Sequence, residues 1–422
     1  MKQLLALFSA LILIVVFSKA LVAQISLSGE IRPRSEFRHG FKEPLETGKK
    51  PAFFTEQRTR LVGGYKSKKV EVGVSIQDVR IWGSVDQVYK VDPSLMNVNQ
   101  AWATIKMNEL NKVIVGRQIL DYDNARILGS LDWAQQGRSH DLLRYIFENK
   151  SWSVHLGLAF NQDSYTPEPA KLDNTFYAST NNYKTLHYTW IKKLFEKSSI
   201  SVLLLNQGMQ IAPDTVNYNQ SIGVNVSHKI GESTFKGEWH YQAGKNGRFK
   251  KIKGFLAAIS LDHSFNNVGT TIGIDWLSGD NPNTDSFEAF TPWYGTNHKF
   301  YGLMDYFYVG NGHKNFGLVN PYFKTHISIN ERTRWVLHLH HFISDTRIKG
   351  SNYSKTNNNI LGNELDLVFS YNITPDVNLK LGYSQMFFAR GMEVVKETMD
   401  PRKTASWGWA MLTLKPKLIK KD

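Results

Sequence analysis

Hydrophobic and polar residues alternate along most of this chain from Gln24 onward. In residues 25–38 the odd positions are mostly apolar, from Ile25 to Phe37, while the even positions from Glu30 onward carry Arg and Glu. A β-strand directs successive side chains to opposite faces, so this segment has one largely apolar face and one strongly charged face. The same period of two returns in residues 152–161, 235–242 and 364–372. The pattern therefore predicts strands and not amphipathic helices.

The connections between these segments alternate in length. Short polar turns are expected at Ser67-Lys68, Asn108–Asn111, Asn149-Lys150, Phe195–Lys197, Ile230–Ser233, His263–Asn267, Asn330-Glu331 and Thr374-Pro375. Longer loops are expected at 39–53, 83–97, 118–140, 162–183, 208–217, 244–253, 279–316, 345–360 and 390–404. The segments between these connections number about 18, with both ends of the chain on the short-turn side.

Regular pairing of short turns with long loops is typical of outer-membrane barrels, which have an even number of antiparallel strands. A soluble β-sandwich or propeller would also alternate, but it would not pair its connections so regularly. Tryptophans near the strand ends fit the aromatic belts of a bilayer interface; they are Trp152, Trp190, Trp239, Trp276, Trp335, Trp407 and Trp409. We predict an all-β fold in which residues 24–422 form a single transmembrane antiparallel β-barrel, with short periplasmic turns and long extracellular loops.

The last predicted strand covers residues 406–415. The chain does not stop on an aromatic residue after this strand but continues through Lys417 to Asp422. We expect these last residues to form a short periplasmic tail.

The first residues have the pattern of a secretory signal peptide. Lys2 is followed by an apolar stretch from Leu4 to Phe17 and then by small residues, ending at Ala23. Such a sequence is removed during export, and we expect cleavage after Ala20 or, in preference, after Ala23. An uncleaved membrane anchor is the alternative. From Gln24 onward no apolar run reaches the ~18 residues that a spanning helix needs.

The composition agrees with a membrane barrel. The 422 residues have a mean hydropathy of −0.35, and 41% of them are hydrophobic. Only the lipid-facing half of each barrel strand must be apolar, whereas a helical membrane protein would be far more hydrophobic throughout. The chain has no cysteine, which excludes a disulfide scaffold and zinc–thiolate sites.

Arginine is the residue type whose positions bear most directly on function. Charged side chains that line a narrow pore favour ions of the opposite sign, and the net charge of this chain is +14. A second interpretation is that these arginines form ladders with Glu30, Glu36, Glu56 and Asp78 and stiffen the barrel wall. The arginines placed on the predicted lumen face are Arg32, Arg34, Arg38, Arg58, Arg60, Arg80, Arg117, Arg144 and Arg334.

The predicted loop 118–140 is unusually rich in residues that recognise polar ligands. It includes Asp121, Arg126, Asp132, Gln135 and Arg138. If the loop folds inward, it narrows the pore and presents guanidinium groups, which pair with carboxylates through two hydrogen bonds. The alternative is an ordinary external loop.

Two stretches resemble the alginate-export family of outer-membrane barrels. They are residues 116–139, with Gly116-Arg117-Gln118, Asp132-Trp133 and Gln136-Gly137-Arg138-Ser139, and residues 294–307, which resemble bacteroidete members in particular. In layout the similarity covers nearly the whole chain after the signal peptide. The resemblance implies an 18-stranded barrel with an arginine-rich lumen that conducts anionic polysaccharide, alginate being the type substrate. It also implies that Arg117, Arg126 and Arg138 are pore or loop residues.

Other chemistry has weaker support. His338 and His340 share the predicted lumen face while His341 points outward, so a three-histidine metal site with Asp345 is not expected. No local signature selects a nucleophile and base, so we expect neither an enzyme nor a bound cofactor. Basic residues interleaved with aromatics can also bind nucleic acid, but secretion and the lipid-facing pattern argue against that partner.

We therefore predict a bacterial outer-membrane channel for passive passage of anionic sugars or polysaccharides. The expected partners are the anionic saccharide, outer-membrane lipid and periplasmic proteins of export or uptake. The alternatives are a general or small-anion porin, a closed surface-binding barrel, and a barrel enzyme that hydrolyses lipid or peptide.

Overall fold

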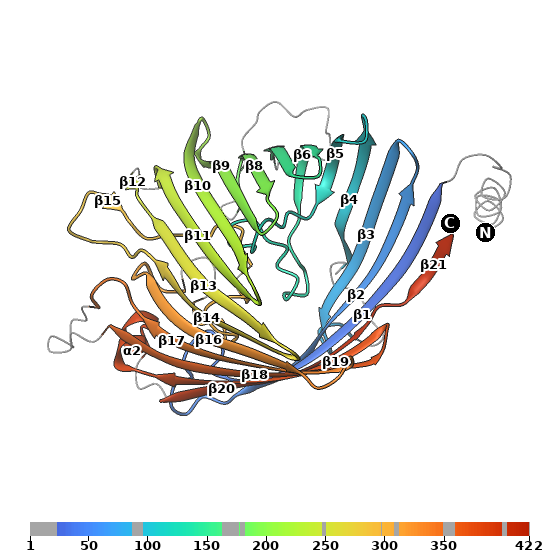
Figure 1. Cartoon of the computed structure of the whole chain (residues 1–422). Helices are drawn as coiled ribbons and strands as arrows, with labels where there is room; N and C mark the ends of the chain where they lie inside the picture. The colour runs from blue at the N-terminus through green and yellow to red at the C-terminus, as the bar shows by residue number, and fades with distance from the viewer. Residues whose placement is uncertain are drawn as a thin grey trace.

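The computed structural model describes residues 23–86, 96–162, 177, 182–246, 250–296, 298–307, 312–348, 359–398 and 403–421. The first 22 residues, and with them nearly all of the expected signal peptide, lie outside these ranges. The described residues form an 18-stranded closed antiparallel barrel, as expected from the alternating sequence. Figure 1 shows the tilted strands around a central space, with loop segments inside the ring.

Each barrel strand pairs with its neighbours in the chain, and β1 pairs with β20 to close the ring. The strands are β1 (Gln24–His39), β2 (Ala52–Lys66), β3 (Val70–Ile81), β4 (Met96–Lys106), β5 (Asn111–Gln118), β6 (His140–Glu148), β7 (Trp152–Phe160), β8 (Thr185–Leu194), β9 (Ser198–Ala212), β10 (Thr215–Ile230), β11 (Ser233–Gly244), β13 (Phe255–Phe265), β14 (Val268–Leu277), β16 (Leu318–Ser328), β17 (Thr333–Ile343), β18 (Ile360–Thr374), β19 (Val377–Phe388) and β20 (Thr404–Leu414).

Besides the terminal strand β21 (Lys417–Lys421), three smaller elements complete the secondary structure of the described residues. The two-residue strands β12 (Lys251–Ile252) and β15 (Ser286–Phe287) pair in parallel and lie outside the barrel sheet. The helix α2 (Arg390–Lys396) precedes β20. No helix in the described ranges is long and apolar enough to cross a membrane.

All eight short turns lie where the alternation predicts them, but the expected long loop 208–217 is wrong. Strands β9 and β10 remain paired up to Ala212 and Thr215, so only Pro213 and Asp214 connect them. The polar residues 215–220 continue the strand because their neighbours on β9 supply backbone hydrogen-bond partners.

The expected short tail at the end of the chain forms a further strand. Beyond Leu414 the chain continues as β21 (Lys417–Lys421), which pairs with the first residues of β1. Pro416 separates β20 from β21, and its carbonyl accepts a hydrogen bond from the Gly29 amide at 3.1 Å. Without β21, the first residues of β1 would have unpaired backbone groups at a sheet edge.

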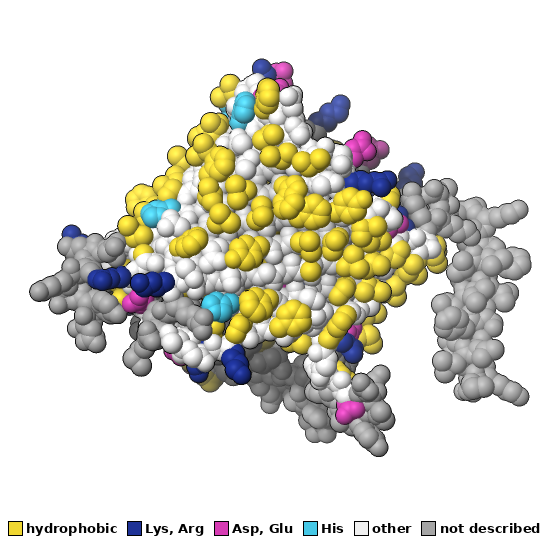
Figure 2. Space-filling view, turned by 90° about the horizontal axis from the view of Figure 1, so that it is seen from below, with side chains coloured by type: hydrophobic (Ala, Val, Ile, Leu, Met, Phe, Trp, Pro, Cys, Tyr) yellow, Lys and Arg dark blue, Asp and Glu magenta, His cyan; other side chains and the backbone are white. Residues whose placement is uncertain are grey.

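The outer surface of the barrel is apolar. Large hydrophobic side chains of alternate strand positions are exposed there, and Figure 2 shows them covering the wall, with charged side chains toward its edges. Of the seven expected interfacial tryptophans, Trp152, Trp239, Trp276 and Trp335 are exposed on this surface at 40–43%. Trp190, Trp407 and Trp409 instead point inward and are buried, because aromatic residues of the inserted loops pack against them.

Candidate functional site

The connection between β5 and β6 folds into the barrel, as one of its two interpretations anticipated (Figure 1). Leu120, Tyr122, Ile127 and Leu128 of this loop (residues 119–139) are buried. Asp123 anchors its first half: one carboxylate oxygen accepts a hydrogen bond from the Ser201 hydroxyl at 2.6 Å, and the other accepts one from the Trp190 indole at 2.9 Å. The loop therefore rests on strands β8 and β9 across the lumen.

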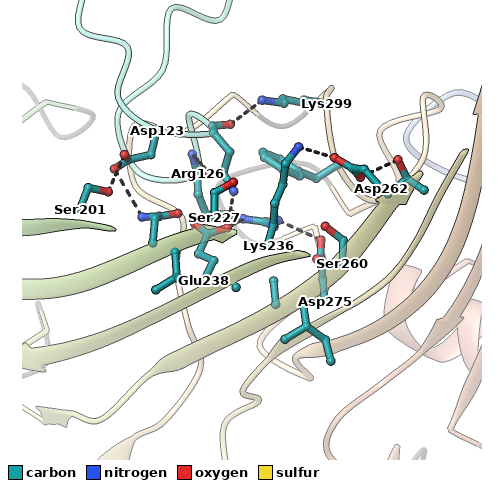
Figure 3. Close-up of a pocket in the computed structure, with 18 of the residues that line it drawn as sticks. Asp123, Arg126, Ser201, Ser227, Lys236, Glu238, Ser260, Asp262, Asp275 and Lys299 are labelled. Carbon is teal, nitrogen blue, oxygen red and sulfur yellow. Dashed lines mark hydrogen bonds and ion pairs between the residues drawn. The ribbon is translucent and has the colours of Figure 1, made fainter. Parts of the chain in front are cut away.

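Arg126 fixes the middle of this loop to two further strands (Figure 3). Its Nη1 donates to Asp275 Oδ2 of β14 at 3.0 Å, and its Nε donates to Glu238 Oε2 of β11 at 3.2 Å. The Phe300 ring lies 3.7 Å from the guanidinium. Burial alone would lower the pKa of Arg126, but Asp275, Tyr301 and Glu238 raise it well above its usual value. Arg126 thus remains charged and held in place.

The second half of the loop meets β1 and β2. Arg58 donates from Nη1 to Asp132 Oδ1 at 2.9 Å, and its Nη2 lies 2.5 Å from Glu30 Oε1. Arg32 donates from Nε to the Gln135 side chain at 3.0 Å and from Nη1 to Asp132 Oδ2 at 3.3 Å. Arg34 donates to the Trp133 carbonyl at 2.8 Å and lies over its ring. These arginines hold the loop against the wall.

The same arginines are also paired along the wall. Arg34 and Arg38 both contact Glu36, and Arg34 contacts Glu56. Arg60 donates to the Gln77 side chain and lies 3.9 Å from Asp132. Arg32, Arg34 and Arg58 are no more than 5% exposed. The inserted loop and the neighbouring carboxylates cover these arginines, which favours the interpretation as structural ladders.

The remaining sequence-predicted arginines divide between the two faces. Arg144 and Arg334 occupy inward positions of β6 and β17, and Arg138 donates to the Gly295 carbonyl within the barrel. The prediction that Arg80 and Arg117 face the lumen is wrong. Each shares its strand face with exposed aliphatic residues, and each pairs with an aspartate there, Asp78 and Asp141 respectively. Their long side chains lie on the outward face because strict alternation continues to the strand ends.

A second inserted segment, residues 288–307, packs against the first. Phe290, Tyr301, Met304 and Tyr306 are fully or almost fully buried. Leu128 and Tyr294 form a bridge between the two segments. Trp133 of the first loop stacks on His298 of the second at 4.0 Å, and Trp407 and Trp409 of β20 contact Trp133 edge-on. The two segments together fill the middle of the lumen.

A cavity of about 650 Å³ remains between the inserted segments and the wall (Figure 3). Many of its lining residues lie near the β8–β9, β10–β11 and β13–β14 turns, so it is on the short-turn side. Its charged and ionisable lining comprises Asp123, Arg126, Lys192, Lys236, Glu238, Asp262, Asp275, Lys299, Lys324 and His338. Serine, asparagine, threonine and tyrosine side chains complete a polar surface.

The lining of this cavity has more cationic side chains than carboxylates that are free to balance them. Arg126 is paired with Glu238 and Asp275, and Lys236 with Asp262. Within the described ranges, no carboxylate lies within 4.0 Å of Lys192, Lys299 or Lys324. Lys299 donates to the Asn124 carbonyl at 3.0 Å and Lys324 to the Lys299 carbonyl at 3.3 Å. Burial raises the pKa of Asp123, which weakens the negative charge of the remaining carboxyl, and burial likewise lowers the pKa of Lys299.

These lysines are the functional candidates that the sequence reasoning missed. Lys192 and Lys324 occupy the inward positions of β8 and β16, in phase with Trp190 and Tyr322. Strand alternation alone could have placed them in the lumen. It could not have shown that they lack carboxylate partners, because Lys299 and the loop that carries it reach the site from a distant part of the chain.

The chain was compared with known proteins. The family model described as alginate export matches residues 23–399 of this chain. Among solved structures, OccAB4 of Acinetobacter baumannii has a TM-score of 0.64 and 10% identity, covering 94% of this chain and 99% of that chain. OccAB1 of the same organism has a TM-score of 0.63 and 12% identity, covering 94% and 97%. OpdK of Pseudomonas aeruginosa with vanillate has a TM-score of 0.57 and 9% identity, covering 93% and 98%.

These structural similarities concern the fold, because the identities are low. OpdK is an outer membrane protein, and its likeness agrees with a barrel in that membrane. A comparison with curated proteins gives no match.

Proposed function

We propose that this chain, which belongs to the alginate export family and is an outer-membrane channel, passes anionic sugars or polysaccharides. The family and the barrel fold support a transport protein and not an enzyme. The substrate class rests on one observation: three lysines without carboxylate partners line the lumen cavity on the short-turn side. A carboxylated sugar that enters from this side meets Lys192 and Lys324 on the wall and Lys299 on the inserted segment.

The lysines carry this proposal better than the arginines of β1 and β2. A charge already paired and buried has little field left for a diffusing ion, whereas an unpaired one attracts it over about 8 Å at physiological salt. Hydroxyl and amide groups such as Ser201, Ser227 and Asn225 line the same cavity. They offer hydrogen bonds to sugar hydroxyls, while the lysines select carboxylates.

A small-anion channel is the second candidate. It is favoured by the inserted segments, which stand in the path of a polymer and leave a limited cavity. One of the similar folds, OpdK, has a structure with vanillate, which is a carboxylate. Passage of a polymer requires loop 119–139 to leave the lumen, whereas passage of a monomeric acid does not.

Planar-bilayer recording tests the proposal. The reversal potential in a KCl gradient measures anion preference, and current block by acidic and neutral oligosaccharides of equal length measures recognition. A unit charge at ~4 Å in water contributes about 1 kcal/mol. We therefore expect the Lys192→Gln, Lys299→Gln, Lys324→Gln triple variant to lose anion preference and to bind acidic oligosaccharides at least about fivefold more weakly.

Lys193 provides a matched control. It is the next residue after Lys192 but faces outward, over the Trp152 ring. Lys193→Gln should keep the wild-type selectivity and block. If the triple variant folds and retains both, the lysines do not select the substrate. If monomeric acids block as well as oligosaccharides do, the small-anion alternative is correct.

A further inference from the structure

Four side chains that could ligate a metal form a compact square on the lumen wall. His338 and His340 are alternate residues of β17, and Asp366 and Glu364 are their register partners on β18. All four occupy inward positions. One ligand atom each from His338, His340 and Asp366 lies within 4.8 Å of the others. Two consecutive, paired strands thus bring two imidazoles and a carboxylate together.

The hydrogen bonds of Asn320 determine which His340 nitrogen is available. The Asn320 amide nitrogen donates to the carbonyls of Pro321 and His341, at 3.2 and 3.1 Å. Its oxygen, 3.0 Å from His340 Nδ1, is therefore the acceptor, and Nδ1 carries the hydrogen. Nε2 of His340 is then unprotonated and has a free lone pair. His340 is only 4% exposed, and its Nε2 has no hydrogen-bond partner among the described residues.

No described Lys or Arg lies within 4.0 Å of the Asp366 or Glu364 carboxyl group. Asp366 accepts hydrogen bonds from the Ser384 hydroxyl at 2.5 Å and the Leu303 amide at 3.3 Å, and its nearest basic group is His338, with Nδ1 4.0 Å from Oδ2. Glu364 Oε2 is buried without a described partner, and Glu364 Oε1 accepts a hydrogen bond from the Met304 amide at 2.7 Å. Buried carboxylates are normally paired or coordinate a metal. A bound divalent cation would supply the missing charge.

We propose that His338, His340 and Asp366 bind a divalent transition-metal ion, with Zn²⁺ as the ion that their donor atoms suit best. Two imidazoles and one carboxylate are a frequent three-ligand set for zinc, leaving a fourth position open. Zinc bonds of about 2.0–2.1 Å place tetrahedral ligand atoms about 3.4 Å apart, so the side chains draw together on binding. His338 also lines the lumen cavity, so the proposed site borders that cavity.

Asn320 is the positioning residue of this site. Metal-bound histidines usually donate their second ring N–H to an oxygen, which fixes the tautomer and orients the ring. The His340–Asn320 contact already has this geometry. Lys324, the register partner of His338 on β16, also faces the square, as do His298 and Asp305 of the inserted segment, which pair with each other at 3.0 Å. The Lys324 ammonium donates to the Lys299 carbonyl, on the inserted segment.

Calorimetric titration tests this site on the folded full-length protein, purified in detergent without a histidine tag and stripped with EDTA. Zn²⁺ should bind with one ion per chain, and Co²⁺ should give the visible absorption of a low-symmetry complex. His340→Ala and Asp366→Asn should abolish stoichiometric binding. Asn320→Ala should weaken it by about 10–100-fold, the usual effect of losing such an orienting contact.

His341 is the matched control, because it is adjacent to His340 but points outward and contacts Asn363. His341→Ala should bind zinc like the wild type. Slower migration after boiling verifies that each variant is a folded barrel. Absence of stoichiometric Zn²⁺ and Co²⁺ binding, or equal binding by folded His340→Ala and wild type, would overturn the proposal. Neither result depends on conductance or sugar selectivity.

Discussion

Asp132 and Arg58 are 74 positions apart in the chain, yet their side chains form a direct ion pair inside the barrel, with Nη1 and Oδ1 separated by 2.9 Å. Asp132 belongs to the inserted loop and Arg58 to the wall strand β2. The guanidinium is fully buried and also pairs with Glu30. This contact joins a loop that starts on one side of the barrel to the strands on another.

Removal of Arg58 should destabilise the protein far more than removal of an exposed arginine. Breaking a buried ion pair costs about 3–5 kcal/mol because the remaining charges lose their partner. Arg58→Met takes this partner from the buried Glu30, whereas Lys415 still contacts Glu30 and Arg32 still contacts Asp132, so we expect a loss near the lower end of that range. Urea unfolding in lipid vesicles, followed by tryptophan fluorescence, measures the loss. Arg117→Met is the control, since its exposed pair with Asp141 is worth about 0–1 kcal/mol. Equal losses of unfolding free energy in the two variants would show that the buried pair of Arg58 contributes no more than the exposed pair of Arg117.

Acid should release the inserted loop. Burial alone would raise the pKa of Asp132, but Arg58 and Arg32 hold it below its usual value. The ionised carboxylate therefore stabilises the docked loop above about pH 4, and this contribution disappears as pH falls through the lowered pKa. Single-channel current should become larger or noisier in that range. Asp132→Asn should show the same behaviour at neutral pH; a quiet Asp132→Asn channel would contradict the assignment.

Arg126→Met should free the middle of the same loop without acid. The side chain holds strands β11 and β14 through Glu238 and Asp275, so both carboxylates would turn toward the cavity. Conductance should increase while anion preference decreases. Arg334→Met is a suitable control, because Arg334 is an exposed inward residue of β17. An unchanged current in a folded Arg126→Met barrel would mean that the loop does not limit passage.

Alkaline pH should strengthen the packing of helix α2. Burial lowers the pKa of Lys396 to about 8, and its ammonium donates to the carbonyls of Tyr306 and Gly312. Between about pH 8 and 10.5 the unfolded chain binds this proton more strongly than the folded chain, so stability rises with pH across that window. Comparing urea midpoints of wild type and Lys396→Met isolates the contribution. Parallel pH profiles of the urea midpoint in the two proteins would exclude a contribution from the Lys396 titration.

Epitope insertions test the orientation of the barrel. Tags within 162–183 or 345–360, or between Pro213 and Asp214, should bind antibody on intact cells. Tags at Asn149-Lys150 or Thr374-Pro375 should bind it only after the outer membrane is opened. The opposite labelling would place the short turns outside the cell and the lysine-lined cavity on the external side.

The local periodicity of the sequence was enough to predict the strands of the barrel wall but not the packing of the loops inside the barrel. Strand alternation predicted the inward positions of Arg32, Arg58 and His340 because each depends only on neighbouring residues. It could not reveal that Asp132 covers Arg58 or that Asp366 faces His338, because those contacts depend on register and on loops inserted from far along the chain. Trp407 shows the same limit. An aromatic residue on a barrel strand suits a bilayer interface equally well, until Trp133 and His298 are found beside it.

The inserted loop leaves and re-enters the wall between adjacent strands, yet it is bonded to β1 and β2 on one side and to β11 and β14 on another. Mechanically it is a strut across a hollow cylinder. A barrel of this circumference resists stretching along its hydrogen bonds but flattens easily, as any thin ring does. The strut sets the distance between facing walls, so it keeps the cross-section round under the lateral pressure of the surrounding lipid. Undocking the loop would then change the shape of the whole aperture, in addition to clearing its centre.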